Sequence, residues 1–346
     1  MREIYRILDA NFNRAREALR VVEDCGRFVL NDPAVTAMAK HFRSDLKELL
    51  DELPHAELVV SRDTPGDLGR EITSRTEPAR EGLEDVATAA CKRLTEALRT
   101  IEEYAKIVAP KQALDVERMR YDAYTLEQRL CTRFLVAQRF RNVKLYVMLS
   151  ADLCKSGSLR AVARAALAGG ADAIQLREKD IDDALFLAYA AELRELTDQT
   201  DRLLIINDRP DIAAIVGADG LHLGQHDLPI PDARRLLRPG AIIGRSCHSV
   251  QQAREAINEG ADYVALGPIY QTAIKHRQPV GPGLLEEIQQ AYETVPLPIV
   301  AVGGINAGNV AEVIRHGAKC VAVCTAVNAA DDPQAAAEAI RKQLDP

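Results

Sequence analysis

The spacing of hydrophobic positions divides the chain into two parts with different periods. As far as about residue 130, apolar residues recur every three or four positions, as on one face of a helix, and no alternating run indicates a strand. The clearest such face consists of Phe12, Ala15, Leu19 and Val22. We predict an all-α helical domain over residues 1–130, followed by a basic linker over 131–143.

From residue 144 the pattern changes to short apolar runs that alternate with amphipathic segments. The runs lie at 144–150, 173–179, 203–208, 220–225, 242–248, 263–269, 298–304 and 321–327. An apolar run followed by a helical segment, repeated along the chain, is typical of a parallel sheet whose strands are joined by helices. Eight units in about 200 residues favour closure into a small TIM (β/α)8 barrel over residues 144–346. An open, doubly wound sheet is the alternative.

Two segments of the helical part resemble each other. Residues 13–30 and 92–109 align without gaps, which indicates a duplicated helix. The shared positions include Arg14/Arg93, Arg20/Arg99 and Glu23/Glu102. Between the two copies, residues 61–78 are rich in proline and glycine, which predicts a long loop.

Composition narrows the class of protein. With 47% hydrophobic and 27% charged residues and a net charge of −7, the chain resembles a globular protein without a nucleic-acid-binding surface. No apolar run reaches the ~20 residues that span a bilayer, and the charged N-terminus lacks the core of a signal peptide, so we expect a cytoplasmic location and no membrane partner. The seven cysteines show no CxxC spacing and are predicted to be reduced structural thiols.

Polar residues collect where the predicted strands end. They are Gln175, Arg177 and Lys179 after the second strand, Asn207 and Asp208 after the third, Gln225 and Asp227 after the fourth, and Ser246 and His248 after the fifth. In a barrel of this kind the carboxyl ends of the strands surround the catalytic mouth.

Two aspartates in this group suggest a metal site. Asp208 and Asp227 end neighbouring strands and supply the hard oxygen ligands that Mg²⁺ prefers. Alternatively, each caps a helix or pairs with a neighbour such as Arg209. Arg177 and Lys179 favour the metal, because cations beside a carboxylate pair suit a metal-bridged polyphosphate.

A second anion site is predicted after strands seven and eight, over 301–306 and 323–327. Barrels commonly bind phosphate there, and Gly303 and Gly304 allow backbone N–H groups to approach closely. A plain tight turn is the alternative. The Gly- and Pro-rich segment 267–283 has the composition of a lid, from which Lys275 could reach a phosphate. His222 is interpreted as a barrel-wall residue rather than a base.

The barrel part resembles the thiamine-phosphate synthases. The matching stretches are "QLREK" (175–179), "INDRPDIA" (206–213), "GADGLHLGQHDLP" (217–229), "GRSCHS" (244–249), "ADYVALGPIY" (261–270) with Thr272 and Lys275, and "VAVGGI" (300–305). The resemblance implies a TIM barrel that joins a 4-amino-2-methylpyrimidinylmethyl diphosphate to a thiazole or carboxythiazole phosphate, releasing pyrophosphate. A dissociative displacement is implied, with Mg²⁺ on Asp208 and Asp227 and no side-chain nucleophile.

The resemblance also assigns binding residues. The pyrimidine diphosphate would contact Gln175, Leu176, Arg177, Glu178, Lys179, Asn207, Ser246 and Lys275, with Arg177, Lys179 and Lys275 stabilising the leaving group. The thiazole phosphate would contact Thr272, Ala273, Ile274, Gly304, Cys324 and Thr325. Two departures from the family pattern stand out. Ile274 replaces a residue with a hydroxyl in the strand-six loop, and strand eight has Cys324 and Thr325 where an aliphatic residue and serine are usual.

The helical part resembles a module that is fused to some of these synthases and is assigned as an alternative hydroxymethylpyrimidine-phosphate kinase. Its residues offer one stripe on each repeated helix: Arg16, Arg20, Glu23 and Arg27, and Thr95, Arg99, Glu102 and Lys106. Solvated ion pairs explain such stripes equally well. The rival functions are a non-catalytic assembly module for this part and a thiazole tautomerase for the barrel. The sequence is compatible with a homo-oligomer.

Overall fold

The computed structural model describes residues 1–30, 32–67, 80–272, 278–291 and 297–345. The chain divides into two compact units, Met1–Phe134 and Leu135–Pro346. The segment predicted as a linker, 131–143, belongs mostly to helix α5 (Pro110–Arg141), which continues through the division between the units. We describe each unit by itself.

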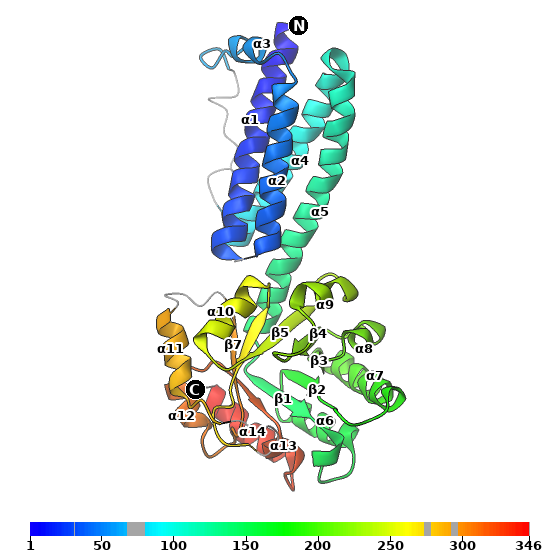
Figure 1. Ribbon diagram of the computed structural model, residues 1–346, viewed down its shortest axis with the longest axis vertical. Helices are drawn as coiled ribbons and strands as arrows, with labels where there is room; N and C mark the ends of the chain where they lie inside the picture. The colour runs from blue at the N-terminus through cyan, green and yellow to red at the C-terminus, as the bar shows by residue number, and fades with distance from the viewer. Residues whose placement is uncertain (31, 68–79, 273–277, 292–296, 346) are drawn as a thin grey trace. The chain divides into compact units, whose positions relative to one another are not determined.

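The second unit is a closed barrel of eight parallel strands in the order β1 to β8, which confirms the predicted TIM barrel and excludes the open sheet (Figure 1). The strands are β1 (Leu145–Leu149), β2 (Ala173–Leu176), β3 (Leu203–Asn207), β4 (Gly220–Leu223), β5 (Ile242–Cys247), β6 (Tyr263–Leu266), β7 (Ile299–Val302) and β8 (Cys320–Val323). The helices are α6 (Leu159–Ala168), α7 (Asp183–Thr200), α8 (Pro210–Ile215), α9 (Ile230–Leu236), α10 (Val250–Asn258), α11 (Gly283–Ala291), α12 (Val310–Arg315), α13 (Thr325–Asn328) and α14 (Pro333–Leu344), with a 3₁₀ turn at Ala151–Leu153.

The strands are apolar along their whole length because both faces are buried. On β1, Leu145, Val147 and Leu149 pack in the layer between strands and helices, whereas Tyr146 points into the barrel. The interior also holds Phe140 at the end of α5. Burial on both faces explains why these strands lack the alternating pattern of a sheet with one wet face.

A Gly-Ala-Asp repeat organises the amino ends of the strands. It occurs immediately before or at the start of β2, β4 and β6, with Asp172, Asp219 and Asp262, and returns as Gly317-Ala318-Lys319 before β8. The glycine has φ between +61° and +92° in all four copies, a conformation that side chains rarely adopt. Each buried carboxylate accepts a backbone N–H from the start of the preceding odd-numbered strand, from Leu145, Leu204 and Ile243 respectively. The repeat therefore ties the strands together in pairs.

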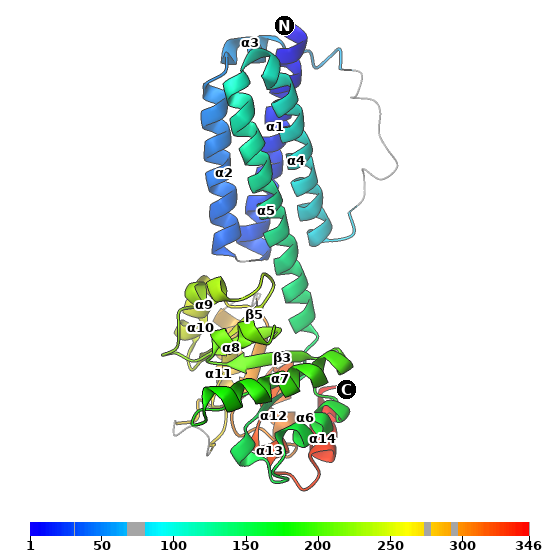
Figure 2. The ribbon, with the colours of Figure 1, turned by 90° about the vertical axis from the view of Figure 1, so that its right-hand side faces the viewer.

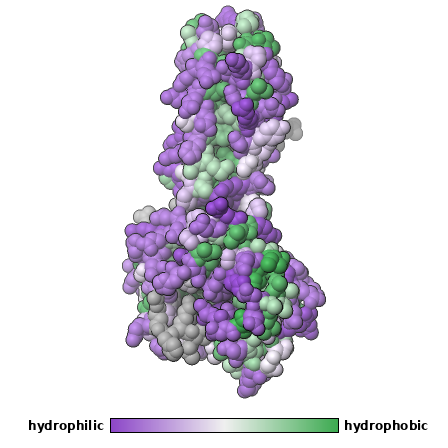
Figure 3. Space-filling model, turned by 45° about the vertical axis from the view of Figure 1, so that its right-hand side comes forward, coloured by the Kyte–Doolittle hydropathy of each residue, from purple (hydrophilic) through white to green (hydrophobic). Residues whose placement is uncertain are grey.

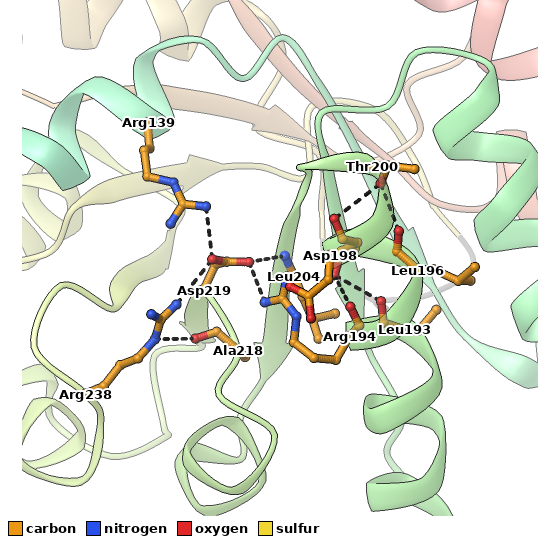
Figure 4. A network of polar contacts seen from close by, with 11 residues as sticks. Arg139, Leu193, Arg194, Leu196, Asp198, Thr200, Leu204, Ala218, Asp219 and Arg238 are labelled. Atoms are coloured by element: carbon orange, nitrogen blue, oxygen red, sulfur yellow. Dashed lines mark hydrogen bonds and ion pairs between the residues drawn. The ribbon is translucent and has the colours of Figure 1, made fainter.

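Asp219 is surrounded by three arginines (Figure 4). Its carboxylate pairs with Arg194 of α7 at 2.7 Å, with Arg139 at 3.1 Å and with Arg238 at 3.3 Å, and accepts from the Leu204 N–H at 3.0 Å. The side chain is only 4% exposed. Although burial opposes ionisation, the Leu204 N–H and Arg194 hold the pKa of Asp219 below its usual value. One carboxylate thus links β3, β4, α7 and the end of α5.

All regular elements described in the first unit are helices, as predicted (Figure 2). They are α1 (Arg2–Asp24) with a π-helical turn at Cys25–Val29, α2 (Pro33–Asp51), α3 (His55–Val60), α4 (Leu83–Val108) and α5 as far as Phe134. Phe12, Ala15, Leu19 and Val22 are all buried in its core. Of the predicted loop, residues 68–78 lie outside the described residues.

The helix duplication extends to a second pair of helices. Glu23 of α1 and Glu102 of α4 are the repeated glutamates, and each pairs with an arginine of the following long helix, Arg43 of α2 and Arg120 of α5. Both arginines lie ten positions after the proline that begins their helix, Pro33 or Pro110. The unit is therefore built from two related helical hairpins, α1–α2 and α4–α5.

The outside of both units is mainly hydrophilic on the face drawn in Figure 3, with smaller groups of hydrophobic residues. All seven cysteines are free thiols, six of them buried, as the spacing predicted. Burial raises the pKa of the Cys25 thiol to about 11, so it stays protonated. Within the described residues, no helix is long and apolar enough to cross a membrane.

Candidate active site

Two adjoining cavities lie at the carboxyl ends of the barrel strands. The first, of about 70 Å³, is lined by residues that include Gln175, Arg177, Asn207, Ser246 and His248. The second, of about 350 Å³, is lined by Thr272, Gly303, Gly304, Asn306, Cys324 and Thr325, among others. Thr272, Gly303 and Ala322 line both. Two adjoining cavities that share part of their lining therefore lie at one mouth.

Asp208 and Asp227 interact with each other, and Asp208 directly follows Asn207, which lines the first cavity; neither aspartate is among the lining residues. Burial and then the Asp227 carboxylate raise the pKa of Asp208 to about 6. Burial acts in the same direction on Asp227, but a hydrogen bond from Asp208 holds the pKa of Asp227 below its usual value. The pair therefore shares a proton only below about pH 6, and both carboxylates are mostly ionised at neutral pH. Asp208 also has φ +62°, which is strained for a residue other than glycine and is typical of functional positions.

The donor set of this pair suits Mg²⁺. Both groups are hard oxygen ligands, and a divalent cation held by them would offset the burial and the repulsion that together raise the pKa of Asp208. Lys179, half exposed, approaches Asp208 with its Nζ 3.4 Å from Oδ2. Of the predicted alternative, a structural pair with a neighbour, the structure has the pair with Lys179 but not the one with Arg209, which pairs with Asp183 and Asp211. Within the described residues, no group of three or more His, Cys, Asp or Glu side chains could hold a metal.

The remaining pyrimidine-side predictions have three different outcomes. Gln175, Arg177, Asn207 and Ser246 line the first cavity. Leu176, by contrast, is fully buried in the layer between strands and helices, because alternate residues of β2 point to opposite faces. Glu178 is also buried and accepts the Ala151 N–H at 2.6 Å, so it holds the loop after β1. Lys275 lies outside the described residues.

The thiazole-side predictions surround the second cavity. At Gly304, φ is +67° and an added Cβ would lie 2.6 Å from the Gln271 carbonyl oxygen; at Gly303 it would lie 2.5 Å from Pro268 Cα. Both glycines are therefore required where the loop after β7 packs against the loop after β6. Cys324 is buried and Thr325 exposed at the start of α13. Ala273 and Ile274 lie outside the described residues.

Comparison with known proteins decides the family. The sequence profile described as "Thiamine monophosphate synthase" matches residues 145–327, and the profile described as "ThiD2 family" matches residues 6–129. A thiamine-phosphate synthase of Synechocystis sp. is 41% identical over 342 residues, covering 99% of this chain and 96% of the relative. One from Nostoc sp. is 39% identical over 345 residues, covering 99% and 94%. The chain belongs to the thiamine-phosphate synthase family.

A solved structure extends this likeness to three dimensions. The thiamine phosphate pyrophosphorylase from Pyrococcus furiosus superposes with a TM-score of 0.55 at 38% identity. The superposition covers 60% of this chain and 98% of the Pyrococcus furiosus chain. The shared part is the size of the barrel unit, so the synthase family has the fold that the strand pattern predicted.

The sequence did not reveal one feature of this synthase-family barrel, a group of five buried hydrogen-bonding side chains, four of which line the first cavity. Tyr146 of β1, Tyr263 of β6 and His222 of β4 lie inside the barrel and bond to one another or to the predicted residues Gln175 and Ser246. A tyrosine within an apolar strand is interpreted as an ordinary core residue. Only the barrel closure brings these five side chains from five strands together.

The charged stripes of the helical unit are only partly solvated. Solvated ion pairs were the alternative explanation of these stripes. Glu23 and Glu102 are 1% and 2% exposed, so these two members of the stripes are buried and not solvated. The flanking cations Arg20, Arg27, Arg99 and Lys106 are 39–55% exposed. Each glutamate therefore sits beneath a cationic surface in a part of this synthase-family chain that matches the ThiD2 profile.

Proposed function

We propose that the barrel unit joins an aminopyrimidinylmethyl diphosphate to a thiazole phosphate, forming thiamine phosphate and pyrophosphate. As a thiamine-phosphate synthase, the protein is a transferase of thiamine biosynthesis. The observation that carries the substrate assignment is the pair of adjoining cavities, one lined by Arg177 and by Asn207, the residue before Asp208, and the other lined by Gly304. Two phosphorylated substrates need two such anion sites on one mouth.

The residues present suit a reaction in which pyrophosphate leaves first. Asp208 and Asp227 would hold Mg²⁺, which supplies positive charge to the diphosphate. Arg177 and Lys179 would stabilise the charge that develops on the leaving group, where preorganised cations are most effective. Gln175, Asn207 and Ser246 would orient the pyrimidine in the first cavity. Departure of pyrophosphate would leave a pyrimidinylmethyl cation. The thiazole nitrogen would attack this cation directly, so no side-chain nucleophile is needed.

The barrel reaction is tested by pyrophosphate release. We expect the full chain to release pyrophosphate when Mg²⁺, the pyrimidine diphosphate and the thiazole phosphate are all present, and to lose this activity when the metal is chelated. A thiazole tautomerase would act on the thiazole alone without Mg²⁺ and release none. Absence of pyrophosphate with both substrates and Mg²⁺ would reject the proposed function.

For the helical unit, we infer a phosphoryl transfer that supplies the diphosphate. The inference is supported by the ThiD2 match and by the exposed cations around Glu23 and Glu102, since such groups bind phosphates. The resemblance assigns the module to phosphorylation of a hydroxymethylpyrimidine phosphate. A non-catalytic assembly module is the alternative.

This second activity is tested with the full chain, ATP and the pyrimidine monophosphate. We expect ADP formation that falls at least about tenfold in Glu102→Gln, because the variant leaves Arg120 without its buried partner. The matched control is Glu103→Gln, the next residue on α4, which is 46% exposed and should retain its rate. No ADP from the unaltered chain would favour the assembly module.

A further inference from the structure

Five side chains form one hydrogen-bonded row across the inside of the barrel. Gln175 Nε2 donates to the Tyr146 hydroxyl at 2.8 Å, the hydroxyls of Tyr146 and Tyr263 are 3.0 Å apart, and Tyr263 bonds His222 Nδ1 at 2.9 Å. His222 Nε2 then lies 2.9 Å from Ser246 Oγ. The two ends of the row, Gln175 and Ser246, line the first cavity, as do Tyr146 and His222. The row therefore connects two groups that would contact the same ligand.

The row is held rigidly from below and from the side. Phe140 stacks on the Tyr263 ring with centroids 4.2 Å apart, and Gly244 lies opposite Tyr263 on β5. A Cβ at Gly244 would lie 2.0 Å from this ring, so any other residue would displace Tyr263. All five members of the row are at most 7% exposed. The hydrogen bonds therefore have little freedom to change partners.

The number of protons in the row sets its direction. Burial keeps both tyrosines protonated by raising the pKa of each. Because Gln175 donates to Tyr146, the Tyr146 proton must go to Tyr263, and the Tyr263 proton to His222 Nδ1. Reversing one of these bonds would leave a buried hydroxyl proton without an acceptor in the row, which costs roughly 1–3 kcal/mol. His222 is then neutral with its proton on Nε2, which it donates to Ser246.

The direction of the hydrogen bonds decides which groups the two ends of the row can offer to a ligand. Ser246 accepts from His222, so its own proton is available to donate into the cavity. Gln175 uses its amide nitrogen on Tyr146, so its Oε1 is available as an acceptor. The cavity therefore offers an acceptor on β2 and a donor on β5, and this polarity is set through Tyr263, which is not among the residues that line the cavity.

We propose that Tyr146, Tyr263 and His222 are positioning residues that select an amino-substituted pyrimidine over its oxo counterpart. The exocyclic amino group donates to Gln175 Oε1 and a ring nitrogen accepts from the Ser246 hydroxyl. An oxo group in place of the amino group presents an acceptor to an acceptor, which a site built for hydrogen bonding rejects. This inference rests on the proposed function, because it takes the pyrimidine diphosphate as the ligand of the first cavity.

The direction of the row is tested without substrate. ¹⁵N NMR of the histidine-labelled full chain reports the protonation of each ring nitrogen, and His222→Gln identifies the His222 signals. We expect a neutral His222 with the proton on Nε2 and an unprotonated Nδ1 at pH 7. A proton on Nδ1, alone or with one on Nε2, would overturn the inference.

The selection is tested by comparing two substrates in one variant. We expect the unaltered chain to favour the aminopyrimidine diphosphate over the 4-oxo analogue by roughly a hundredfold or more in kcat/KM for pyrophosphate release. Tyr263→Phe removes the central hydroxyl and should lower this preference at least about tenfold while leaving the KM for thiazole phosphate within about twofold. Tyr270→Phe, which removes a tyrosine hydrogen bond to Glu312 outside the row, should keep the preference.

The outcomes separate the two proposals. An unchanged preference in a folded Tyr263→Phe overturns the selection while leaving the proposed function intact. If the variant does not fold, the His222 tautomer in the unaltered chain still decides the direction of the row. Absence of pyrophosphate release by the unaltered chain rejects the proposed function and, with it, the aminopyrimidine selection.

Discussion

Replacing Asp208 by asparagine is expected to lower kcat/KM for pyrophosphate release at least about tenfold, because the variant removes one of the two charges that would hold Mg²⁺ on the diphosphate. Asparagine is the informative substitution. It retains the size of the side chain and tolerates the left-handed backbone conformation that Asp208 adopts at φ +62°. The expected loss is therefore one of charge and not of backbone geometry. Asp227→Asn should give a loss of the same order.

The matched control for Asp208→Asn is Asp201→Asn. Asp201 is the other described residue besides glycine with a positive φ, +51°, and it ends α7, away from the cavities at the mouth. We expect Asp201→Asn to retain its rate. The Mg²⁺ concentration needed for half-maximal rate should rise in Asp208→Asn and stay constant in the control. A near-normal rate in both Asp208→Asn and Asp227→Asn would reject the metal assignment.

Replacing Asp219 by asparagine is expected to destabilise the barrel unit by about 3–5 kcal/mol at pH 7, the usual cost of breaking a buried ion pair from one side. The carboxylate is 4% exposed, and its removal would leave Arg194, itself only 16% exposed, without this partner. Arg139 and Arg238 are 46% and 51% exposed and would be solvated again, so most of the loss comes from Arg194 and the Leu204 N–H. The change in free energy of unfolding is measured by urea denaturation, followed by hydrogen exchange of peptides from β3 and β4.

The same substitution predicts a pH dependence. The pKa of Asp219 is lowered in the folded state, so its contribution to stability is fully present above the unfolded pKa of about 3.9 and is lost as the pH falls through the folded pKa. The difference in stability between the unaltered chain and Asp219→Asn should therefore be constant near neutral pH and shrink below about pH 4.

The control for Asp219 is Asp232→Asn on α9. Asp232 forms an i,i+3 pair with Arg235 at 3.9 Å, and the two side chains are 58% and 83% exposed. Its replacement should change stability by less than about 1 kcal/mol, as is usual for an exposed pair. A difference between the two variants that does not depend on pH would contradict the assignment of the Asp219 effect to its charge.

The predictable part of the candidate site is the part that follows from position along a strand. Asn207, Asp208 and Ser246 stand at strand ends, and every parallel barrel brings strand ends to one mouth. Leu176 and Glu178, which line neither cavity, were predicted from the resemblance to a contiguous motif. Neighbours along a strand point to opposite faces, so a five-residue motif cannot contribute every side chain to one cavity.

The part of the site that the sequence did not predict depends on closure of the barrel. Nothing in the sequence around Tyr146 or Tyr263 distinguishes these tyrosines from ordinary core residues. They become partners because β1 and β6 face the same interior, 117 positions apart in the chain. The Gly-Ala-Asp repeat is visible in the sequence, yet its role needs the structure, because Asp219 meets Arg139, Arg194 and Arg238 only after α5, α7 and α9 are in place.

The sequence by itself determined the number and order of the strands, the helical first unit, the strand-end carboxylates and the family, because each follows from local spacing or from a contiguous motif. The tertiary structure alone decided which polar groups are buried and which buried groups meet. Burial turned Glu23 and Glu102 from presumed surface charges into interior ones. Barrel closure joined Gln175 to Ser246 through three side chains from other strands. Both depend on contacts between residues distant in the chain, which periodicity does not encode.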